Sequence, residues 1–333
     1  MPDTVLVTGA TGFVGNHLIA RLIKDGYTVR CLVRDKEKAE ELKQRYSVEL
    51  VYGDVTDRQS LKGISKGVSY VFHLAAVGHV SAISEESYRL FTGTNEGGTM
   101  NMIKEFRNSD SLRKFVHFSS TAAMGPIGLP VLNECSRPNP VTPYQKSKYR
   151  SEKIVLAAAE RIGFPAVIVR PCMIYGPGGT GEFYKFCRLM KKGFFPKVGL
   201  GENLTPLVYV EDVVSGAVLA ALNGKSKEAY ILASEKSIPM DEMRNLIMKS
   251  IGTKAPYLFV PSPVALLGAK LLEWACSICG KEPIATYRNI KSTVTDRTFD
   301  ITKAQTELDY RVKKNFEEGI AETIQWYKTQ GLI

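Results

Sequence analysis

The stretch Gly9-Ala10-Thr11-Gly12-Phe13-Val14-Gly15 decides how this chain is expected to fold. It directly follows an apolar run, Thr4–Thr8, that is typical of a buried parallel strand. After it, apolar residues recur at the spacing of an amphipathic helix, at Leu18, Ile19, Leu22 and Ile23. A strand, a glycine-rich turn and a helix in this order form the context in which such a loop binds a dinucleotide.

The three glycines have separate expected tasks in that loop. Gly9 permits the tight turn, Gly12 lets the backbone approach a pyrophosphate, and Gly15 lets the helix pack closely on the strand. The first helical turn then offers unpaired N–H groups to phosphate oxygens. Because the spacing is Gly-x-x-Gly-x-x-Gly and not Gly-x-Gly-x-x-Gly, a turn without a ligand remains the alternative.

Arg34 follows the second expected strand, Thr28–Val33, where a dinucleotide-binding chain usually carries an acid for the ribose 2′-hydroxyl. The planar guanidinium is suited to a 2′-phosphate instead, so NADP(H) is favoured over NAD(H) as the cofactor. The neighbouring Asp35 keeps NAD(H) open, and Arg34 as a merely solvated residue at a strand end is a further alternative.

Strand-like runs alternate with helix patterns in the first half of the chain. The strands are expected at Thr4–Thr8, Thr28–Val33, Glu49–Tyr52, Ser69–Leu74, Lys114–Ser119 and Ala166–Arg170, and helices at Glu37–Arg45, Gly97–Phe106 and Tyr144–Arg161. This alternation predicts an α/β fold with a doubly wound parallel sheet of the Rossmann type. We expect residues 1–171 to form the dinucleotide-binding domain, to which 208–234 return, and 172–207 and 235–333 to form a smaller substrate-binding domain.

Composition narrows the choice of partners. The net charge is +10, but acidic residues are mixed with the basic ones, so a small-molecule substrate is expected and no nucleic acid. No basic and then apolar leader precedes the first strand, which favours a cytoplasmic location. No metal is predicted, because Cys276 and Cys279 lack a second pair and the histidines lack ligand spacing: His17, His73, His79 and His117.

Two segments of the second half raise the question of a membrane or an anionic ligand. The first is a basic cluster interleaved with apolar residues, which also fits an amphipathic helix: Lys185, Arg188, Lys191, Lys192 and Lys197 among Phe183, Phe186, Leu189, Phe194 and Phe195. The second, Ala255–Ala269, carries no charge but is too short to span a bilayer. For the helix expected at Pro263–Ile278, core packing is the first expectation, with a pocket for an apolar substrate or a peripheral membrane contact as alternatives.

A second motif, Tyr144-Gln145-Lys146-Ser147-Lys148, supplies residues for chemistry on an alcohol. Tyr144 can move the proton on the substrate oxygen, although a free phenol has a pKa of about 10. Lys148 lies one helical turn away, where its ammonium can favour the phenolate and reach the nicotinamide ribose. Ser120, at the end of the strand Lys114–Ser119, can orient the substrate oxygen, with Ser119 and Thr121 as substitutes.

These motifs resemble the extended short-chain dehydrogenase/reductase family over nearly the whole chain. Further matches are Gly53-Asp54-Val55, His73-Leu74-Ala75-Ala76, the structural asparagine Asn95, Ser120 counted back from Gly125, Arg170-Pro171 with Tyr175-Gly176-Pro177, and Val208–Val213. The resemblance implies catalysis by Ser120, Tyr144 and Lys148. With Arg34, it implies a cofactor site made of Gly9, Thr11, Gly12, Phe13, Val14, Gly15, Asp54, Val55, Leu74, Ala75, Ala76, Asn95, Tyr144, Lys148 and Pro171.

Departures from the family's patterns narrow the activity. Thr121-Ala122 replaces the Asp-Glu pair of nucleotide-sugar dehydratases, so dehydration is disfavoured. Cys172 and Thr205-Pro206-Leu207 occupy places where epimerases carry an asparagine and an arginine, although Arg297 can still contact a phosphate. The overall sequence pattern is similar to that of the 3β-hydroxysteroid dehydrogenase and dihydroflavonol reductase branch.

We therefore expect an NADP(H)-dependent oxidoreductase that interconverts a secondary alcohol and a ketone on a fairly apolar small molecule. Its candidate substrate contacts are Thr121, Cys172 and Arg297. The alternatives are a nucleotide-sugar 4-epimerase with tightly bound NAD(P) and a non-catalytic NAD(P) sensor or binding module. The helices at Gly97–Phe106 and Tyr144–Arg161 resemble the elements through which family members dimerise, so a homodimer is expected.

Overall fold

The computed structural model describes residues 2–78, 84–126, 130–193, 195–253, 259–278, 287, 290–291 and 294–333 of the chain. His79, Phe194, Cys279 and the first part of the uncharged segment, residues 255–258, lie outside the described residues.

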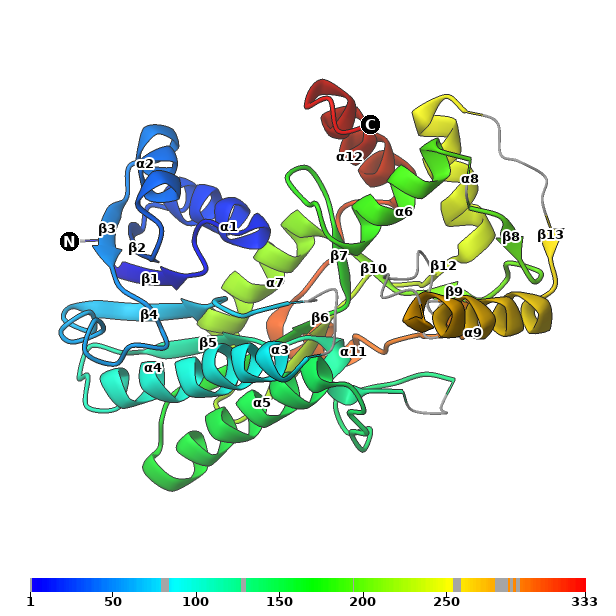
Figure 1. Ribbon diagram of the computed structural model, residues 1–333. Coiled ribbons are helices and arrows are strands. Elements are labelled where there is room, and N and C mark those ends of the chain that lie inside the picture. The colour runs from blue at the N-terminus through cyan, green and yellow to red at the C-terminus, as the bar shows by residue number, and fades with distance from the viewer. Residues whose placement is uncertain are drawn as a thin grey trace.

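A seven-stranded parallel sheet forms the centre of the molecule (Figure 1). Its order is β11-β6-β5-β4-β1-β2-β3, with the bounds β1 Thr4–Thr8, β2 Thr28–Val33, β3 Glu49–Tyr52, β4 Val68–His73, β5 Lys114–Phe118, β6 Ala166–Pro171 and β11 Ala229–Leu232. The predicted doubly wound parallel sheet is confirmed. The strand order reverses between β1 and β4, so a ligand is expected at their carboxyl ends.

Helices cover both faces of the sheet (Figure 1). One face packs against α1 (Phe13–Lys24), α2 (Lys36–Arg45), α7 (Val210–Asn223) and α11 (Thr302–Leu308). The other packs against α4 (Thr99–Phe106) and α5 (Pro143–Ile162). Every residue of β4 and of β6 is buried, as expected for parallel strands with helices on both sides.

The helical segment before α4 is longer than the sequence predicted. It begins with α3 (Glu85–Leu90), which Ser84 caps, and continues through the π-helical turns of η1 (Phe91–Gly98). The expected start at Gly97 is therefore wrong, because Leu90 and Gly98 keep helical backbone angles and no break separates the three pieces. Single π-helical segments often occur at functional sites, and this one holds Asn95.

A smaller lobe is built on a separate apolar cluster. It comprises α6 (Glu182–Lys191), α8 (Met240–Ile251) and α12 (Phe316–Thr329), with short strands β7 Met173–Tyr175, β8 Lys197–Val198, β9 Leu204–Thr205, β10 Leu207–Tyr209, β12 Ile238–Pro239 and β13 Phe259–Val260. In α6, Phe183, Cys187 and Met190 are buried. Lys185, Arg188 and Lys191 of the basic cluster therefore lie on the solvated side of an amphipathic helix, whereas Lys197 belongs to β8 and is half-buried.

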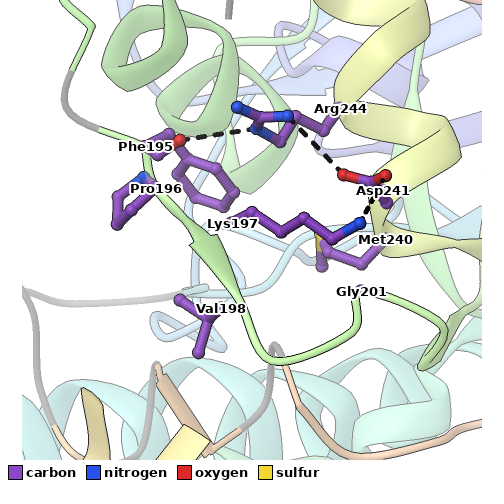
Figure 2. A pocket seen from close by; sticks show the side chains of 8 residues that line it. All are labelled: Phe195, Pro196, Lys197, Val198, Gly201, Met240, Asp241 and Arg244. Atoms are coloured by element: carbon purple, nitrogen blue, oxygen red, sulfur yellow. Dashed lines mark hydrogen bonds and ion pairs between the residues drawn. The ribbon is translucent and has the colours of Figure 1, made fainter. Parts of the chain in front are cut away.

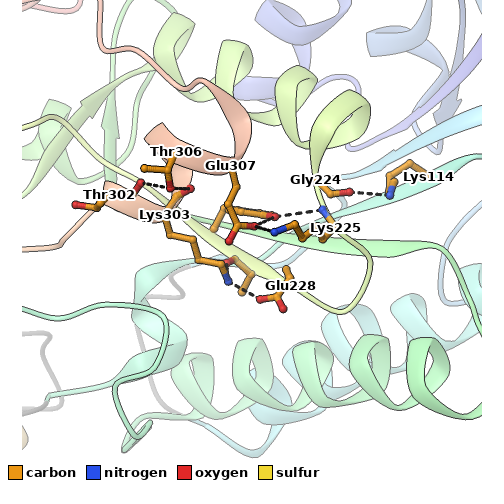
Figure 3. A network of polar contacts seen from close by, with 10 residues as sticks. Lys114, Gly224, Lys225, Glu228, Thr302, Lys303, Thr306 and Glu307 are labelled. Atoms are coloured by element: carbon orange, nitrogen blue, oxygen red, sulfur yellow. Dashed lines mark hydrogen bonds and ion pairs between the residues drawn. The ribbon is translucent and has the colours of Figure 1, made fainter.

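A polar network ties α11 to the edge strand β11 (Figure 3). The Lys303 ammonium pairs with Glu228 and donates to Ala229 O over 3.1 Å. The Glu307 carboxylate accepts from the Tyr230 hydroxyl over 2.8 Å and pairs with Lys225 at 3.3 Å. These contacts cover the outer edge of the sheet, which would otherwise present unpaired backbone groups.

The helix α9 (Ser262–Ile278) is mostly exposed, which contradicts the expectation of core packing. Ala269 is buried, but large apolar side chains on another side of the helix face solvent. The sequence identified an apolar helix correctly and misplaced it, because periodicity does not say what covers a face. In the described part of the chain, no helix combines the length and apolar character needed to cross a membrane.

Candidate active site

The glycine turn is packed too tightly to accept side chains. Gly9 has a φ of +69°, and a Cβ there would lie 2.9 Å from Ala75 N. A Cβ on Gly15 would lie 2.3 Å from Gly9 O. Gly12 precedes α1, and no side chain caps that helix. The backbone therefore forms a cradle with uncapped N–H groups at a helix start, which fits the pyrophosphate of a dinucleotide.

A second glycine turn lies against the start of α1. The ring of Phe13 is 3.5 Å from the position of a Cβ on Gly178 and 2.8 Å from that on Gly179. Nε2 of His17 donates to Pro177 O over 2.8 Å. From the smaller lobe, the Tyr327 hydroxyl donates to Gly179 O over 2.5 Å. The turn after β7 thus joins the glycine loop to α12.

At the end of β2, the Arg34 side chain is largely exposed and its Nη1 lies 3.2 Å from Asp54 Oδ2. Burial alone would raise the pKa of Asp54, but hydrogen bonds from Thr56 and Arg34 bring it below its ordinary value. Oδ1 of Asp35 instead accepts from the N–H groups of Glu37 and Lys38, at 3.0 and 3.2 Å. The Asp35 carboxylate is thus engaged as the cap of α2.

Buried polar contacts shape the carboxyl end of β4. Ala75 N donates to Thr8 Oγ1 over 3.0 Å, and Nδ1 of His73 lies 2.9 Å from the same hydroxyl. Burial, with the charge of Lys148, lowers the pKa of His73 to about 3, so the ring is neutral. Of the remaining expected cofactor contacts at this edge, Val55 is buried, Leu74 is half-buried, and Ala76 and Thr11 are exposed.

Asn95 is buried in η1 and its amide is fully engaged. Its Oδ1 accepts from Val77 N over 2.8 Å, and its Nδ2 donates to Val77 O and to Ser147 Oγ over 3.1 and 2.9 Å. The side chain therefore joins the loop after β4 to α5, which carries Tyr144 and Lys148.

Ser120 and Tyr144 meet at the carboxyl edge of the sheet. Ser120 follows β5, accepts from Ala122 N over 3.1 Å to cap η2 (Thr121–Met124), and lies 3.5 Å from Pro171 O. Tyr144 is the second residue of α5. Burial raises the pKa of the Tyr144 phenol, and a hydrogen bond with Ser120 acts in the opposite direction. The two hydroxyls can therefore address one substrate oxygen.

Lys148 lies one turn beyond Tyr144 and is 3% exposed. Its Nζ donates to Phe118 O over 2.6 Å. Burial lowers the pKa of the ammonium to about 8, while the negative charge of Glu152 acts to raise it. Glu152 is itself buried and accepts from Nε and Nη2 of Arg170 over 2.9 and 2.7 Å. A chain of alternating charges thus runs beneath the site.

The three expected substrate residues lie in different surroundings. Thr121 is half-buried next to Ser120, whereas Cys172 is 6% exposed within the main core cluster, where burial raises the pKa of its thiol. Arg297 is exposed, yet desolvation lowers the pKa of its guanidinium. The backbone N–H of Arg297 donates to Leu204 O over 2.9 Å. Of these three residues, only Thr121 therefore lies directly beside Ser120.

A small cavity of about 20 Å³ lies in the smaller lobe (Figure 2). Its charged side chains are paired with one another: Lys197 Nζ lies 3.0 Å from Asp241 Oδ2, and Arg244 Nη1 lies 3.5 Å from Asp241 Oδ1. The volume suits about one water molecule. Among the described residues, no group of three or more His, Cys, Asp or Glu side chains is arranged to hold a metal ion.

Comparison with known proteins shows to which family the chain belongs. A sequence model of the NAD dependent epimerase/dehydratase family matches residues 5–233. The chain belongs to this family. Its members are NAD(P)-dependent epimerases, dehydratases and reductases, so the chain is an enzyme of the oxidoreductase and epimerase type, and the resemblance to extended short-chain dehydrogenases/reductases is confirmed. The sensor alternative is not retained.

Relatives within the family have different activities. The chain is 28% identical to the 4-hydroxy-2-methyl-3-oxo-4-farnesyl-3,4-dihydroquinoline-1-oxide ketoreductase of Stigmatella aurantiaca, over 94% of this chain and 93% of that protein. It is 27% identical to the UDP-glucose 4-epimerase of Vibrio cholerae, over 98% and 96%. The crystal structure of gox2253 is similar with a TM-score of 0.81 and 29% identity, over 99% of each chain.

Glu152, which lies beneath the site between Lys148 and Arg170, was not identified from the sequence. A signal was present: it follows Lys148 by four residues in a helix, so the two share one face, and Arg170 had already been noted as a landmark. His73 and Thr8 were noted only within motifs. Their role as a buried hydrogen-bonded pair between neighbouring strands became visible from the packing of β1 on β4.

Proposed function

We propose that this enzyme interconverts a secondary alcohol and a ketone on a fairly apolar small molecule, with NADP(H) as its cofactor. The observation that carries the proposal is the placement of Ser120 beside the Tyr144 phenol, whose pKa it acts to lower, one helical turn from the buried Lys148. In reduction, Tyr144 gives its proton to the ketone oxygen while the Ser120 hydroxyl binds that oxygen. Lys148 holds the ribose and favours the phenolate afterwards. The bound cofactor supplies or accepts the hydride.

The proposed cofactor site follows the same edge of the sheet. The N–H groups of Phe13, Val14 and Gly15 face the pyrophosphate, with Thr11 exposed beside them. The side chain of Asp54 contacts the adenine, and the remaining backbone contacts come from Val55, Leu74, Ala75, Ala76 and Pro171. Asn95 acts by holding the Val77 loop. The preference for NADP(H) is supported by the exposed Arg34 and by Asp35, whose carboxylate caps α2.

An apolar substrate is supported by two observations. Cys172 and Thr205-Pro206-Leu207 replace polar residues that bind nucleotide sugars in epimerases, and the Stigmatella relative is named for a ketone that carries a farnesyl chain. In this proposal residues 172–207 and 235–333, apart from α11 on the central sheet, form the substrate-binding domain, and of the candidate contacts Thr121 lies nearest the reacting carbon. A homodimer through η1–α4 and α5 is part of the same proposal.

Nucleotide-sugar 4-epimerisation is the second candidate. Arg297 is exposed but partly desolvated, which is a suitable environment for binding a diphosphate, and the Vibrio relative is named a UDP-glucose 4-epimerase. In that reaction the hydride is returned to the other face, so no net oxidation occurs. Calorimetric titration of the NADP-saturated enzyme with UDP, GDP, dTDP and CDP at two salt concentrations separates the candidates, since salt-resistant binding of one nucleotide favours epimerisation.

Tyr144→Phe tests the assignment of the proton donor. We expect it to lower kcat/KM for NADPH-dependent reduction of apolar ketones by about 10²- to 10⁴-fold, because the proton donor is lost. NADPH affinity, followed by fluorescence, should change little. Tyr149→Phe on the same helix is the matched control and should keep its activity. If Tyr144→Phe retains most of its turnover, the proposed mechanism is wrong.

A further inference from the structure

One side of α9 presents a continuous apolar stripe to solvent. Val264, Leu267, Leu271 and Trp274 are 58, 60, 57 and 66% exposed. Their spacing of three, four and three residues places them on one helical face. Surface helices of globular proteins normally bury such a face, so this stripe points to a partner that the isolated chain does not contain.

The apolar surface continues beyond the start of α9. Leu200 and Phe259 are also exposed. Phe259 belongs to β13, which pairs with β8, and Gly199 N donates to Val260 O over 2.9 Å. A Cβ on Gly199 would lie 2.3 Å from Ser262 Oγ, so the Leu200 turn lies against the first residue of the helix. Figure 1 places α9 and β13 at the side of the molecule opposite α1 and α2.

The described charged groups beside the stripe are mainly cationic. The ammonium groups of Lys270 and Lys291 lie 4.8 and 6.0 Å from the ring centroid of Tyr287. The Glu273 carboxylate accepts the Tyr287 N–H over 3.0 Å and keeps its negative charge, so these three side chains together carry a net positive charge. Leucine and tryptophan along one face, with lysine at its flank, are the features of a helix that lies in the headgroup region of an anionic bilayer.

The size of the stripe argues against a second copy of the chain as its partner. From Val264 to Trp274 the helix advances about 15 Å, and the helix is about 10 Å wide. A stable protein interface buries about 800 Å² on each partner, which is several times this footprint. A lipid surface needs no such minimum, because a few inserted side chains and nearby basic groups together supply the affinity.

We propose that α9 inserts its apolar stripe into the headgroup region of an anionic membrane, and that the enzyme takes its substrate from that surface. The second part rests on the proposed function, which assigns an apolar substrate. The first part does not, because the exposed stripe and its lysines exist whatever the reaction is.

Cosedimentation of the full chain with lipid vesicles tests the proposal without substrate or cofactor, so the result is independent of the reaction. We expect binding to vesicles that contain phosphatidylglycerol, weaker binding to phosphatidylcholine alone, and further weakening at high salt. The double variant Leu267→Ser/Leu271→Ser should bind about tenfold more weakly or worse. The control Ile162→Ser/Leu222→Ser, which changes equally exposed side chains outside α9, should bind like the unchanged chain.

A second measurement does not depend on the folding of the double variant. The chain has two tryptophans, so Trp326→Phe leaves Trp274 alone, and its emission should shift to shorter wavelength on addition of phosphatidylglycerol vesicles. The proposal is overturned if the unchanged chain binds neither vesicle, or if both double variants lose binding equally. It is also overturned if analytical ultracentrifugation shows a dimer that the α9 variant alone dissociates.

Discussion

Lys148 is the residue at which burial and charge oppose each other most directly. Burial disfavours its ammonium, Glu152 favours it, and Arg170 fixes Glu152 with two hydrogen bonds. The other titratable groups near it are Tyr144, whose pKa is raised by burial, and His73 and His117, whose pKa burial keeps far below neutrality. Burial has the larger effect on the Lys148 pKa, and Glu152 is the neighbouring charge that opposes it.

Glu152→Gln should shift the alkaline limb of the activity profile to lower pH. The Lys148 ammonium has a pKa of about 8, so it is charged below that pH and neutral above it. Removing the carboxylate lowers this pKa further, and the ammonium is then lost at a lower pH. The measurement is kcat against pH at saturating cofactor and substrate, in the range where circular dichroism shows folded protein. Glu160→Gln, exposed on the same helix, is the control, and an unmoved limb would contradict the argument.

Arg34→Ala should weaken NADPH binding by about tenfold or more, because a charged hydrogen bond to the 2′-phosphate is lost. NADH binding should change much less, since NADH has no such phosphate. Fluorescence titration with both cofactors measures the difference. Arg45→Ala removes a similarly exposed arginine from α2 and should affect neither. Equal weakening of both cofactors would show that Arg34 acts only through Asp54.

At the scale of elements, local sequence predicted most of the sheet and its helices. The strands β1, β2 and β3 have the bounds expected from apolar runs, and α5 extends the expected helix Tyr144–Arg161 by one residue at each end. The signal was strong in β1 and β2 because a parallel strand that is covered on both faces needs a mostly apolar run. The π-helical segment η1 was missed, since a change from 3.6 to more residues per turn leaves no recognisable pattern over eight residues.

The docking of α11 on the sheet should depend on its buried leucine more than on its surface charges. Leu308 is fully buried in the main core cluster, so Leu308→Ala should lower the free energy of unfolding by about 2–5 kcal/mol. Lys225→Ala removes a mostly exposed partner of Glu307 and should cost about 1 kcal/mol or less. Denaturation by urea measures both. Similar losses in the two variants would mean that the network in Figure 3 contributes more than its exposure suggests.

At the scale of the whole molecule, the sequence was informative wherever a site residue lies inside a short motif. Ser120, Tyr144 and Lys148 were predicted to act together because Ser120 follows an expected strand and the other two lie one turn apart in an expected helix. The surroundings of Cys172 and Arg297 were not predictable in this way. They depend on contacts between segments that are far apart in the sequence. In one such contact, Leu132 pairs with Phe299 and Leu132 N donates to Thr298 O over 2.9 Å.

The hydrogen bond from Tyr327 to Gly179 has a consequence for how the enzyme is made. On the ribosome, the glycine loop and most of the central sheet emerge early, but the turn that lies against Phe13 is held by a helix that begins only at Phe316. Strand β6, which pairs with β5 on one side, also lacks its outer neighbour until residues 229–232 have been added. The nascent chain therefore carries an open strand edge and an unbraced nucleotide loop for much of its synthesis, a period in which bound chaperone or free cofactor would protect it.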